Sequence, residues 1–426
     1  MKRLIYLFAF VLSIWSCDQP TQPLEDFYHF RNISRFSMAN PLYPEMVIGE
    51  RLNLESLLTL RDANNQKVNI PEGTLLYYAN GQVLPGNIFT ATAQGTYRLS
   101  AGIGNRTSNS VTITVLPPGV YPNVRIPVIF HAVSTNLTEA QISNLINGLT
   151  ASFRNQWRLG SDPKDPNSAD CFVSFYAADT DPTGRTLTVR GLNRVTGSRT
   201  QFTEEQGTEE AWRFFWEPTR YLNVWVMGFT GSYQNVSFAY YPSVTQPLIG
   251  LSVGSVGSSP SIPYGVFLNS RHTNLIPLFA HEVGHALGLR HVFAGNLDTF
   301  SGCTTTDPDF CADTPYYDRN AYVSNINALQ MNRTSCTGIP YVSTNFMDYD
   351  RSFENSFTRD QRLRVRHVIS HGLWLPTPFN GAPNRRVAAN GYVPKPDDYR
   401  FVPPIHCGPA LGTYYFGRLP KIHKNH

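Results

Sequence analysis

The chain has 426 residues, of which 41% are hydrophobic, so it is long enough to bury sizeable cores and to form two or more domains. Its formal net charge is only +4, and lysine and arginine do not gather in a stripe with interleaved aromatic residues. We therefore expect no nucleic-acid partner. The 31 glycines and 31 prolines predict many turns and short elements.

The first residues have the pattern of an export signal. Two basic residues precede an apolar run over 4–14 that is too short for a permanent membrane span. A small residue stands directly before Cys17, which resembles a bacterial lipoprotein signal and implies a lipid anchor on Cys17 at the cell surface or outer membrane. Trp15 departs from the usual pattern, so plain secretion stays open. We expect a signal peptide over 1–17 and a tether over 18–24.

The next region has the pattern of a small all-β unit. Segments 95–101 and 110–115 alternate polar and apolar residues as half-buried strands do, and 51–54 and 74–78 are also strand-like. Asn80-Gly81 predicts a hairpin turn. Residues 25–117 resemble a bacterial immunoglobulin-like sandwich, which would serve either as a spacer or for adhesion and substrate capture. Pro117-Pro118-Gly119 closes this region and stiffens the joint to the next.

Beyond the joint, helices alternate with strands, which predicts an α/β (α+β) domain with a mixed sheet over residues 124–372. Thr138-Glu139-Ala140-Gln141 offers a capping box for its first helix. Residues 265–269 are expected to form the edge strand, whose unpaired backbone would bind an extended peptide. The other predicted strands are 124–132, 171–177 and 221–227, and the predicted helices are 137–155 and 204–216.

The most specific pattern is His281-Glu282-Val283-Gly284-His285, followed by Gly288 and His291. On a helix, His281 and His285 leave the same face, and two neutral imidazoles at that spacing can bind one zinc ion. Gly288 can adopt the left-handed conformation that ends the helix, which would return His291 as the third nitrogen. The fourth position stays open for water, with Glu282 beside it as a base. This arrangement is typical of a catalytic zinc site.

Two further helix boundaries can be predicted. Asn274 is expected to cap the histidine helix, with Pro277 in its first turn, where the missing N–H does no harm. A closing helix is expected from Thr358 to about residue 370. His367 and His371 stand four residues apart on it, but no glutamate follows His367, so a solvated face is expected there.

An irregular acidic segment follows His291. It contains Asp307, Asp309, Asp313 and Thr314, whose spacing does not match an EF-hand. Oxygen ligands on a flexible loop suit calcium, so we expect either a structural Ca²⁺ ion or a solvated acidic loop.

Five cysteines remain besides Cys17, and an exported protein oxidises accessible pairs. One bridge is expected to close the segment that holds Cys303, Cys311 and Cys336, with the partner of Cys336 left open. A bridge between Cys171 and Cys407 is a further alternative, and one thiol is left over.

Downstream lies Asn345-Phe346-Met347-Asp348-Tyr349. With this run the chain resembles the metzincin metalloproteases, in which the extended histidine pattern is followed by a Met-containing turn. More narrowly, it resembles the pappalysin family over roughly residues 124–372. The other segments that carry this resemblance are Asp313-Thr314-Pro315, Phe357-Thr358 with Gln361, 180–184 and 191–194.

The resemblance implies a zinc endopeptidase that binds a protein or peptide in extended form. It implies that Met347 forms a hydrophobic floor under the zinc ligands and that Tyr349 stabilises the oxyanion, and it adds that such loops can carry calcium. Two rival functions stay open: a zinc amidase acting on non-protein substrates, and a surface binding protein with a vestigial zinc site. The Pro- and Gly-rich tail, 373–426, gives no functional signal.

Overall fold

The computed structural model describes residues 32–40, 44–66, 68, 70, 73–294, 302–303, 307–324, 331–349, 351–376 and 392–404. The predicted signal peptide, its Cys17, the tether and Cys407 lie outside these ranges. In the described part of the chain, no helix has the length and apolar character needed to cross a membrane.

The N-terminal region is built from short strands. Its main sheet has the order β2-β10-β8-β5-β6, with β9 beside β8, and the pairs β1-β4 and β3-β7 lie outside it. Asn80 and Gly81 both have positive φ between β5 and β6, so the predicted hairpin is confirmed. The strands are β1 (Arg35–Met38), β2 (Glu45–Val47), β3 (Arg51–Asn53), β4 (Leu58–Arg61), β5 (Leu75–Ala79), β6 (Gln82–Val83), β7 (Ile88–Thr90), β8 (Gly95–Ile103), β9 (Arg106–Thr107) and β10 (Val111–Leu116).

One hydrophobic core joins these sheets. Alternate residues of β10, Val111, Ile113 and Val115, are fully buried, as the alternating pattern predicts. They share this core with Leu52 of β3 and Phe89 of β7. The main sheet and the β3-β7 pair therefore bury a common apolar interior.

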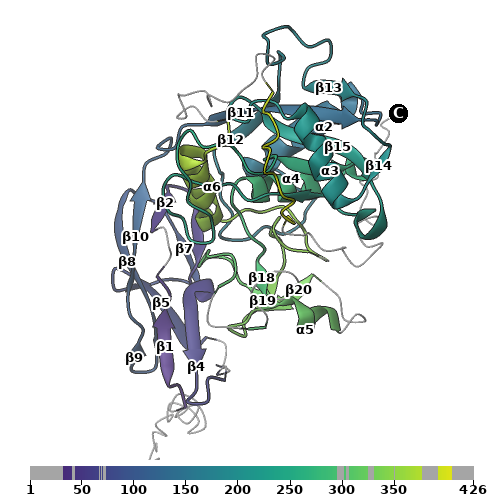
Figure 1. Cartoon of the computed structure of the whole chain (residues 1–426). Coiled ribbons are helices and arrows are strands. Elements are labelled where there is room, and N and C mark those ends of the chain that lie inside the picture. Colours follow the sequence, from purple (N-terminus) through teal and green to yellow (C-terminus); the bar gives the residue numbers. More distant parts are fainter. Residues whose placement is uncertain are drawn as a thin grey trace, which may run out of the picture.

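A second, mixed sheet organises the remainder of the chain (Figure 1). Its order is β12-β11-β15-β17-β16, with β13 beside β11 and β14 beside β15, and only β16 runs antiparallel to its neighbour. The strands are β11 (Val124–Val133), β12 (Val173–Ala177), β13 (Leu192–Val195), β14 (Gln201–Phe202), β15 (Leu222–Phe229), β16 (Phe238–Ala239) and β17 (Val266–Asn269).

The central strand β15 feeds two cores because successive side chains point to opposite faces. Val224 and Val226 join the core that contains helices α2 (Glu139–Phe153) and α4 (Ile276–Ala286). Trp225 and Met227 join a second core, which Ala211 of α3 (Glu204–Ala211) also enters. The sheet is therefore covered on both faces, and the histidine helix α4 lies on the α2 face.

Capping boxes begin three of the described helices. Thr138 and Gln141 cap α2 reciprocally, as predicted, and Thr358 and Gln361 cap the closing helix α6 (Arg359–His371) in the same way. Thr203 does so for α3. The prediction for α4 is half wrong: Pro277 lies in its first turn, but the N-cap is Leu275 and no side chain caps it. The chain enters α4 from a 3-10 turn that Asn269 caps, and the Leu275 N–H is bonded to the His272 carbonyl.

The predicted edge strand is not at the edge. Strand β17 pairs with β15 on one side and with β16 on the other. The outer position belongs to β16, which has two residues, Phe238 and Ala239, and is too short to recognise as a strand from its sequence pattern.

Short elements follow α4. Strand β18 (Phe293–Ala294) pairs with β19 (Tyr317–Asp318), helix α5 (Arg319–Ser324) comes next, and β20 (Asn332–Thr334) pairs with β21 (Pro340–Val342). Figure 1 shows these elements beside the N-terminal strands, away from the mixed sheet.

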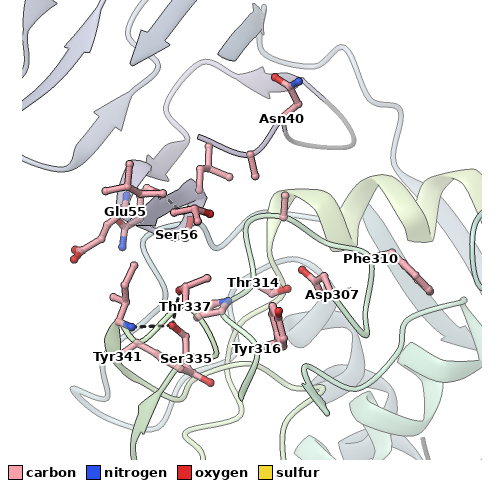
Figure 2. A pocket seen from close by; sticks show the side chains of 18 of the residues that line it. Asn40, Glu55, Ser56, Asp307, Phe310, Thr314, Tyr316, Ser335, Thr337 and Tyr341 are labelled. Carbon is pink, nitrogen blue, oxygen red and sulfur yellow. Dashed lines mark hydrogen bonds between the residues drawn. The ribbon is translucent and has the colours of Figure 1, made fainter. Parts of the chain in front are cut away.

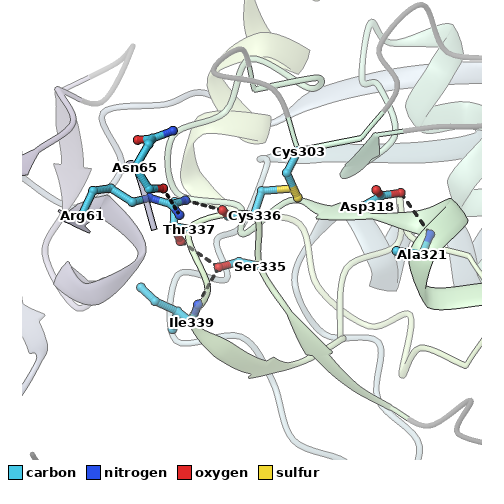
Figure 3. The surroundings of a disulfide bond; sticks show 9 residues. All are labelled: Arg61, Asn65, Cys303, Asp318, Ala321, Ser335, Cys336, Thr337 and Ile339. Atoms are coloured by element: carbon cyan, nitrogen blue, oxygen red, sulfur yellow. Dashed lines mark hydrogen bonds between the residues drawn. A yellow bond between two sulfur atoms is a disulfide. The ribbon is translucent and has the colours of Figure 1, made fainter. Parts of the chain in front are cut away.

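The two halves of the molecule are joined by buried polar contacts. Arg362 of α6 is fully buried and pairs with Glu50, and its guanidinium lies over the ring of Tyr121. The side chain of Asn167 accepts the backbone N–H of Asn53. Arg61 donates to the carbonyl of Cys336, as Figure 3 shows. The N-terminal region is thus fixed against the half that contains the mixed sheet.

A cavity of about 420 Å³ lies at the same junction, between η1 (Leu54–Leu57) and the loop that begins at Asp307. Figure 2 shows Glu55 and Ser56 on one side of it and Thr314, Tyr316 and Thr337 on the other. None of the three patterned histidines lines it.

Candidate metal centre

The structure brings His281, His285 and His291 together at the end of α4. All three are buried, and they are the group of potential metal ligands found among the described residues. The Nε2 atom of His291 lies 3.3 Å from that of His281 and 3.0 Å from that of His285. Zn–N bonds of about 2.0–2.1 Å in a tetrahedron place nitrogens about 3.3 Å apart, so the spacing fits one zinc ion.

Backbone carbonyls orient two of these rings. His281 donates from Nδ1 to the carbonyl of Phe346, 2.6 Å away, and His285 donates from Nδ1 to the carbonyl of Leu289, 2.8 Å away. With the proton held on Nδ1, each Nε2 presents its lone pair to the shared point. Burial, and then the neighbouring His291, lowers the pKa of His281 to about 3 and that of His285 well below its usual value. Both rings are therefore neutral, as metal ligands must be.

Gly288 makes the turn that returns His291. Its φ is +86°, in the left-handed region, as predicted. A Cβ there would lie 2.6 Å from Cγ2 of Val368 in α6, so space as well as backbone conformation requires glycine. The turn between the second and third histidines is therefore packed directly on the closing helix.

Glu282 follows His281 on α4 and is fully buried. Its carboxyl group is therefore shielded from solvent on the same helix as His281 and His285. A buried carboxylate at this point of the helix is suited to proton transfer rather than to solvent contact.

Met347 lies beneath the histidine helix. It is fully buried, and a Cβ on Gly284 would lie 2.6 Å from its sulfur, so the thioether fills the space that this glycine leaves. The turn is fixed by Asn345, whose side-chain oxygen accepts the Met347 N–H and whose amide donates to Gln361 of α6. Asn345 and Gln361, which both lie in segments that carry the family resemblance, are thus joined by a direct hydrogen bond.

Tyr349 lies against the histidines, with its ring centroid 4.6 Å from that of His291 and 5.3 Å from that of His281. The guanidinium carbon of Arg319, at the start of α5, lies 5.2 Å from the Tyr349 ring centroid. The phenol ring is therefore part of the wall of the histidine site.

Sequence reasoning missed the groups that hold Tyr349. Its N–H donates to Asp348, 2.7 Å away, and its carbonyl accepts from Arg333 of β20, 3.3 Å away. Asp348 also accepts from the hydroxyl of Tyr317 at 2.7 Å. Asp348 could have been suspected from its place in the turn, but Arg333 lies in a segment with no motif.

The acidic loop does not form a comparable group. Asp309 accepts the N–H of Cys311 and the hydroxyl of Thr314, while Asp307 accepts the N–H of Asp309. Asp313 accepts the N–H of Asp360 and lies 3.9 Å from Arg359. Among the described residues each of these three carboxylates accepts at least one hydrogen bond from the chain itself, while Oδ1 of Asp313 has no hydrogen-bond partner. Calcium binding stays a prediction.

The disulfide joins Cys303 to Cys336 (Figure 3). This pairing closes the acidic segment, as predicted, and resolves the partner that the spacing left open. Cys171 and Cys311 are buried thiols. The alternative bridge from Cys171 involves Cys407, which lies outside the described residues.

The second histidine pair is half-buried on α6 rather than on a solvated face. His367 and His371 have ring centroids 4.6 Å apart on α6, and His367 Nε2 bonds to the carbonyl of Gln246. No third ligand among the described residues joins this pair.

Comparison with known proteins places residues 205–370 within the model of peptidase family M43, described as pregnancy-associated plasma protein-A. An extracellular metalloprotease of Colletotrichum graminicola is 34% identical over 134 residues, which are 30% of this chain and 42% of that protein. One from Arthroderma otae is 28% identical over 151 residues, covering 32% of this chain and 51% of that protein. The chain thus spans about half the length of these curated relatives.

Among solved structures, mature mirolysin of Tannerella forsythia, in complex with a cleaved peptide, is similar at 25% identity and a TM-score of 0.44. The match covers 58% of this chain and 91% of that one. The family match includes all three histidines, Glu282, Met347 and Tyr349. Residues 205–370 of this chain are therefore similar to the pappalysin-type peptidases of family M43.

Proposed function

We propose that this protein is an exported zinc endopeptidase that hydrolyses peptide bonds with His281, His285 and His291 as metal ligands and Glu282 as general base. The observation that carries the proposal is the convergence of three buried imidazoles at separations that suit one zinc ion, on a helix that also carries the buried Glu282. The family of residues 205–370 supports it. The names of the extracellular relatives support export.

When bound, zinc supplies Lewis acidity that polarises a carbonyl and makes water a nucleophile near neutral pH. The residues of the chain perform the remaining tasks. Glu282 takes the proton of the attacking water and passes it to the leaving amine. Tyr349 donates a hydrogen bond to the carbonyl oxygen as negative charge develops on it. Met347 supports the histidine helix from below.

The substrate is proposed to bind in extended form along β16 rather than β17, because β16 is the last strand on this side of the sheet. Two residues after β16, the ring of Tyr241 lies 5.5 Å from that of His285. A peptide added beside β16 would therefore run past the metal centre.

The immunoglobulin-like assignment of residues 25–117 and the lipid anchor on Cys17 stay proposals. The common core of the main sheet and the β3-β7 pair supports a sandwich. Its fixed contacts with the peptidase half favour a structural role over a loose spacer.

The test is Glu282→Gln, which keeps the shape of the side chain and removes the base. We expect zinc content to stay at one ion per chain while casein and peptide hydrolysis fall by about 10²–10⁴-fold, the usual contribution of a general base. Retention of most activity would exclude this role for Glu282. A wild-type protein that leaves casein and a peptide library intact would favour the amidase alternative instead.

A further inference from the structure

Helix α6 carries three buried arginines that face different partners. Arg359 lies near Asp313 and Asp360, and Arg362 pairs with Glu50. Arg364, also fully buried, donates to backbone carbonyls: to Gly288 from Nη2 at 3.1 Å and from Nε at 3.4 Å, and to Ile249 from Nη1 at 3.1 Å. Burying a guanidinium is costly, so a residue committed to these carbonyls is suited to fixing them in place.

The Gly288 carbonyl belongs to the peptide group that leads from the helix to the third histidine. Arg364 holds its oxygen, and the N–H of the same peptide group, from Leu289, donates to the carbonyl of Gly284 at 2.9 Å. Both the carbonyl and the N–H of the Gly288–Leu289 peptide group are therefore hydrogen-bonded.

The next carbonyl along the chain orients a ligand. It belongs to Leu289 and accepts the Nδ1–H of His285 at 2.8 Å, and His291 follows two residues later. A rotation of the Gly288–Leu289 peptide group would displace the acceptor of His285 and the path to His291 together.

We infer that Arg364 is a positioning residue for the metal centre, holding the Gly288 turn so that His285 and His291 stay converged. The inference rests on the proposed function, since it concerns affinity for zinc at that site. Groups that orient metal ligands from the outer shell typically change metal affinity by about 10–100-fold when they are removed. We expect a loss of this size without Arg364.

The test compares three variants of the full chain. Arg364→Met keeps the approximate length of the side chain and removes every hydrogen-bond donor. Arg364→Lys keeps the charge, but its single ammonium group cannot bond to the Gly288 and Ile249 carbonyls at the same time. Arg362→Met is the matched control: it removes an equally buried arginine from the same helix, but one that faces Glu50. Zinc affinity is measured by competition with a chromophoric chelator, at a temperature where circular dichroism shows each variant folded.

We expect Arg364→Met to bind zinc about 10–100-fold more weakly than wild type. The zinc affinity of Arg364→Lys should lie between those of wild type and Arg364→Met. Arg362→Met should lower the unfolding temperature yet keep zinc affinity within about threefold. The visible spectrum of bound Co²⁺, which reports ligand geometry, should change in Arg364→Met and not in Arg362→Met.

Equal zinc affinity in wild type and Arg364→Met would overturn the inference, as would an equal loss in Arg362→Met. If Arg364→Met does not fold, Arg364→Lys decides by the same criterion: wild-type affinity overturns the inference and weaker binding supports it. Wild-type protein that binds no zinc would overturn the proposed function, and this inference with it.

Discussion

The histidine centre and the acidic loop each gather several potential metal ligands in buried surroundings, yet they differ in where the lone pairs point. At the histidine centre, carbonyls of Phe346 and Leu289 take the Nδ1 protons, which leaves Nε2 lone pairs directed at one point. In the loop, Asp309 and Asp313 accept hydrogen bonds from the chain itself. Potential ligands form a metal site when the chain hydrogen-bonds one polar atom of each side chain and leaves the other polar atom available to the metal.

The largest expected effect comes from removing a ligand. His285→Ala should lose zinc and reduce peptide hydrolysis to background, because two imidazoles and water hold zinc poorly. Metal analysis of the purified variant and a peptide assay measure both. His367→Ala changes a histidine of the other i,i+4 pair and should retain zinc and activity. Equal losses in the two variants would contradict the assignment.

A smaller effect is expected at the wall of the site. Tyr349→Phe removes only the phenol hydroxyl and should lower kcat by about 10²-fold, as loss of one oxyanion donor does, with KM changed by less than about twofold. Steady-state kinetics with a fluorogenic peptide provide the measurement, and zinc content serves as the control. An unchanged kcat would remove Tyr349 from the mechanism and leave the metal ligands unaffected.

A third prediction concerns a single carboxyl group, that of Asp165, which accepts the backbone N–H of Asn167. Its ionisation should make the stability of the fold depend on pH. Burial, opposed by the N–H of Asn167, raises the pKa of Asp165 to about 7. Because the folded pKa lies above the unfolded one, the protonated form favours folding, and this stability is lost as pH rises from about 4 through 7. Relative to Asp165→Asn, wild type should therefore lose about 2–3 kcal/mol of unfolding free energy between pH 5 and pH 8.

Urea unfolding of both proteins at the two pH values measures this difference. Parallel behaviour of wild type and Asp165→Asn would show that Asp165 ionises normally in the folded protein.

The smallest effect is expected from calcium. A site occupied at 100 times its Kd would add about 2.7 kcal/mol of stability, a shift of several degrees in Tm. Because the loop carboxylates already accept hydrogen bonds from the chain, we expect 1 mM CaCl₂ to move the Tm of the zinc-loaded protein by less than about 1 °C. A rise of several degrees that Asp309→Asn abolishes would instead establish the calcium site.

Much of the fold could be predicted where local chemistry determines it. The capping residues Thr138 and Thr358 marked helix starts because their hydroxyls satisfy backbone N–H groups within one turn. Asn80-Gly81 marked its hairpin for a similarly local reason. The convergence of the three histidines was predictable because His281 and His285 share a helix face and Gly288 determines the exit from the helix.

Features that depend on distant partners could not be predicted in this way. Two residues are too few for an alternating pattern, so β16 and its place outside β17 escaped recognition. The pairing of Cys303 with Cys336 depends on the path of the chain rather than on spacing. Arg364 has the pattern of a surface charge on a polar helix, and its burial comes from the approach of two distant segments, the Gly288 turn and the loop at Ile249.

The pairing of Arg362 with Glu50 affects how a shorter version of this protein could be made. Cutting the chain at the Pro117–Gly119 linker would seem natural, but the resulting fragment would keep Arg362 and lose its counter-charge. Breaking a buried ion pair from one side costs about 3–5 kcal/mol, a large share of the stability of an ordinary domain. A practical minimal fragment should therefore start upstream of Glu50, or replace Arg362 with an apolar residue in the same step.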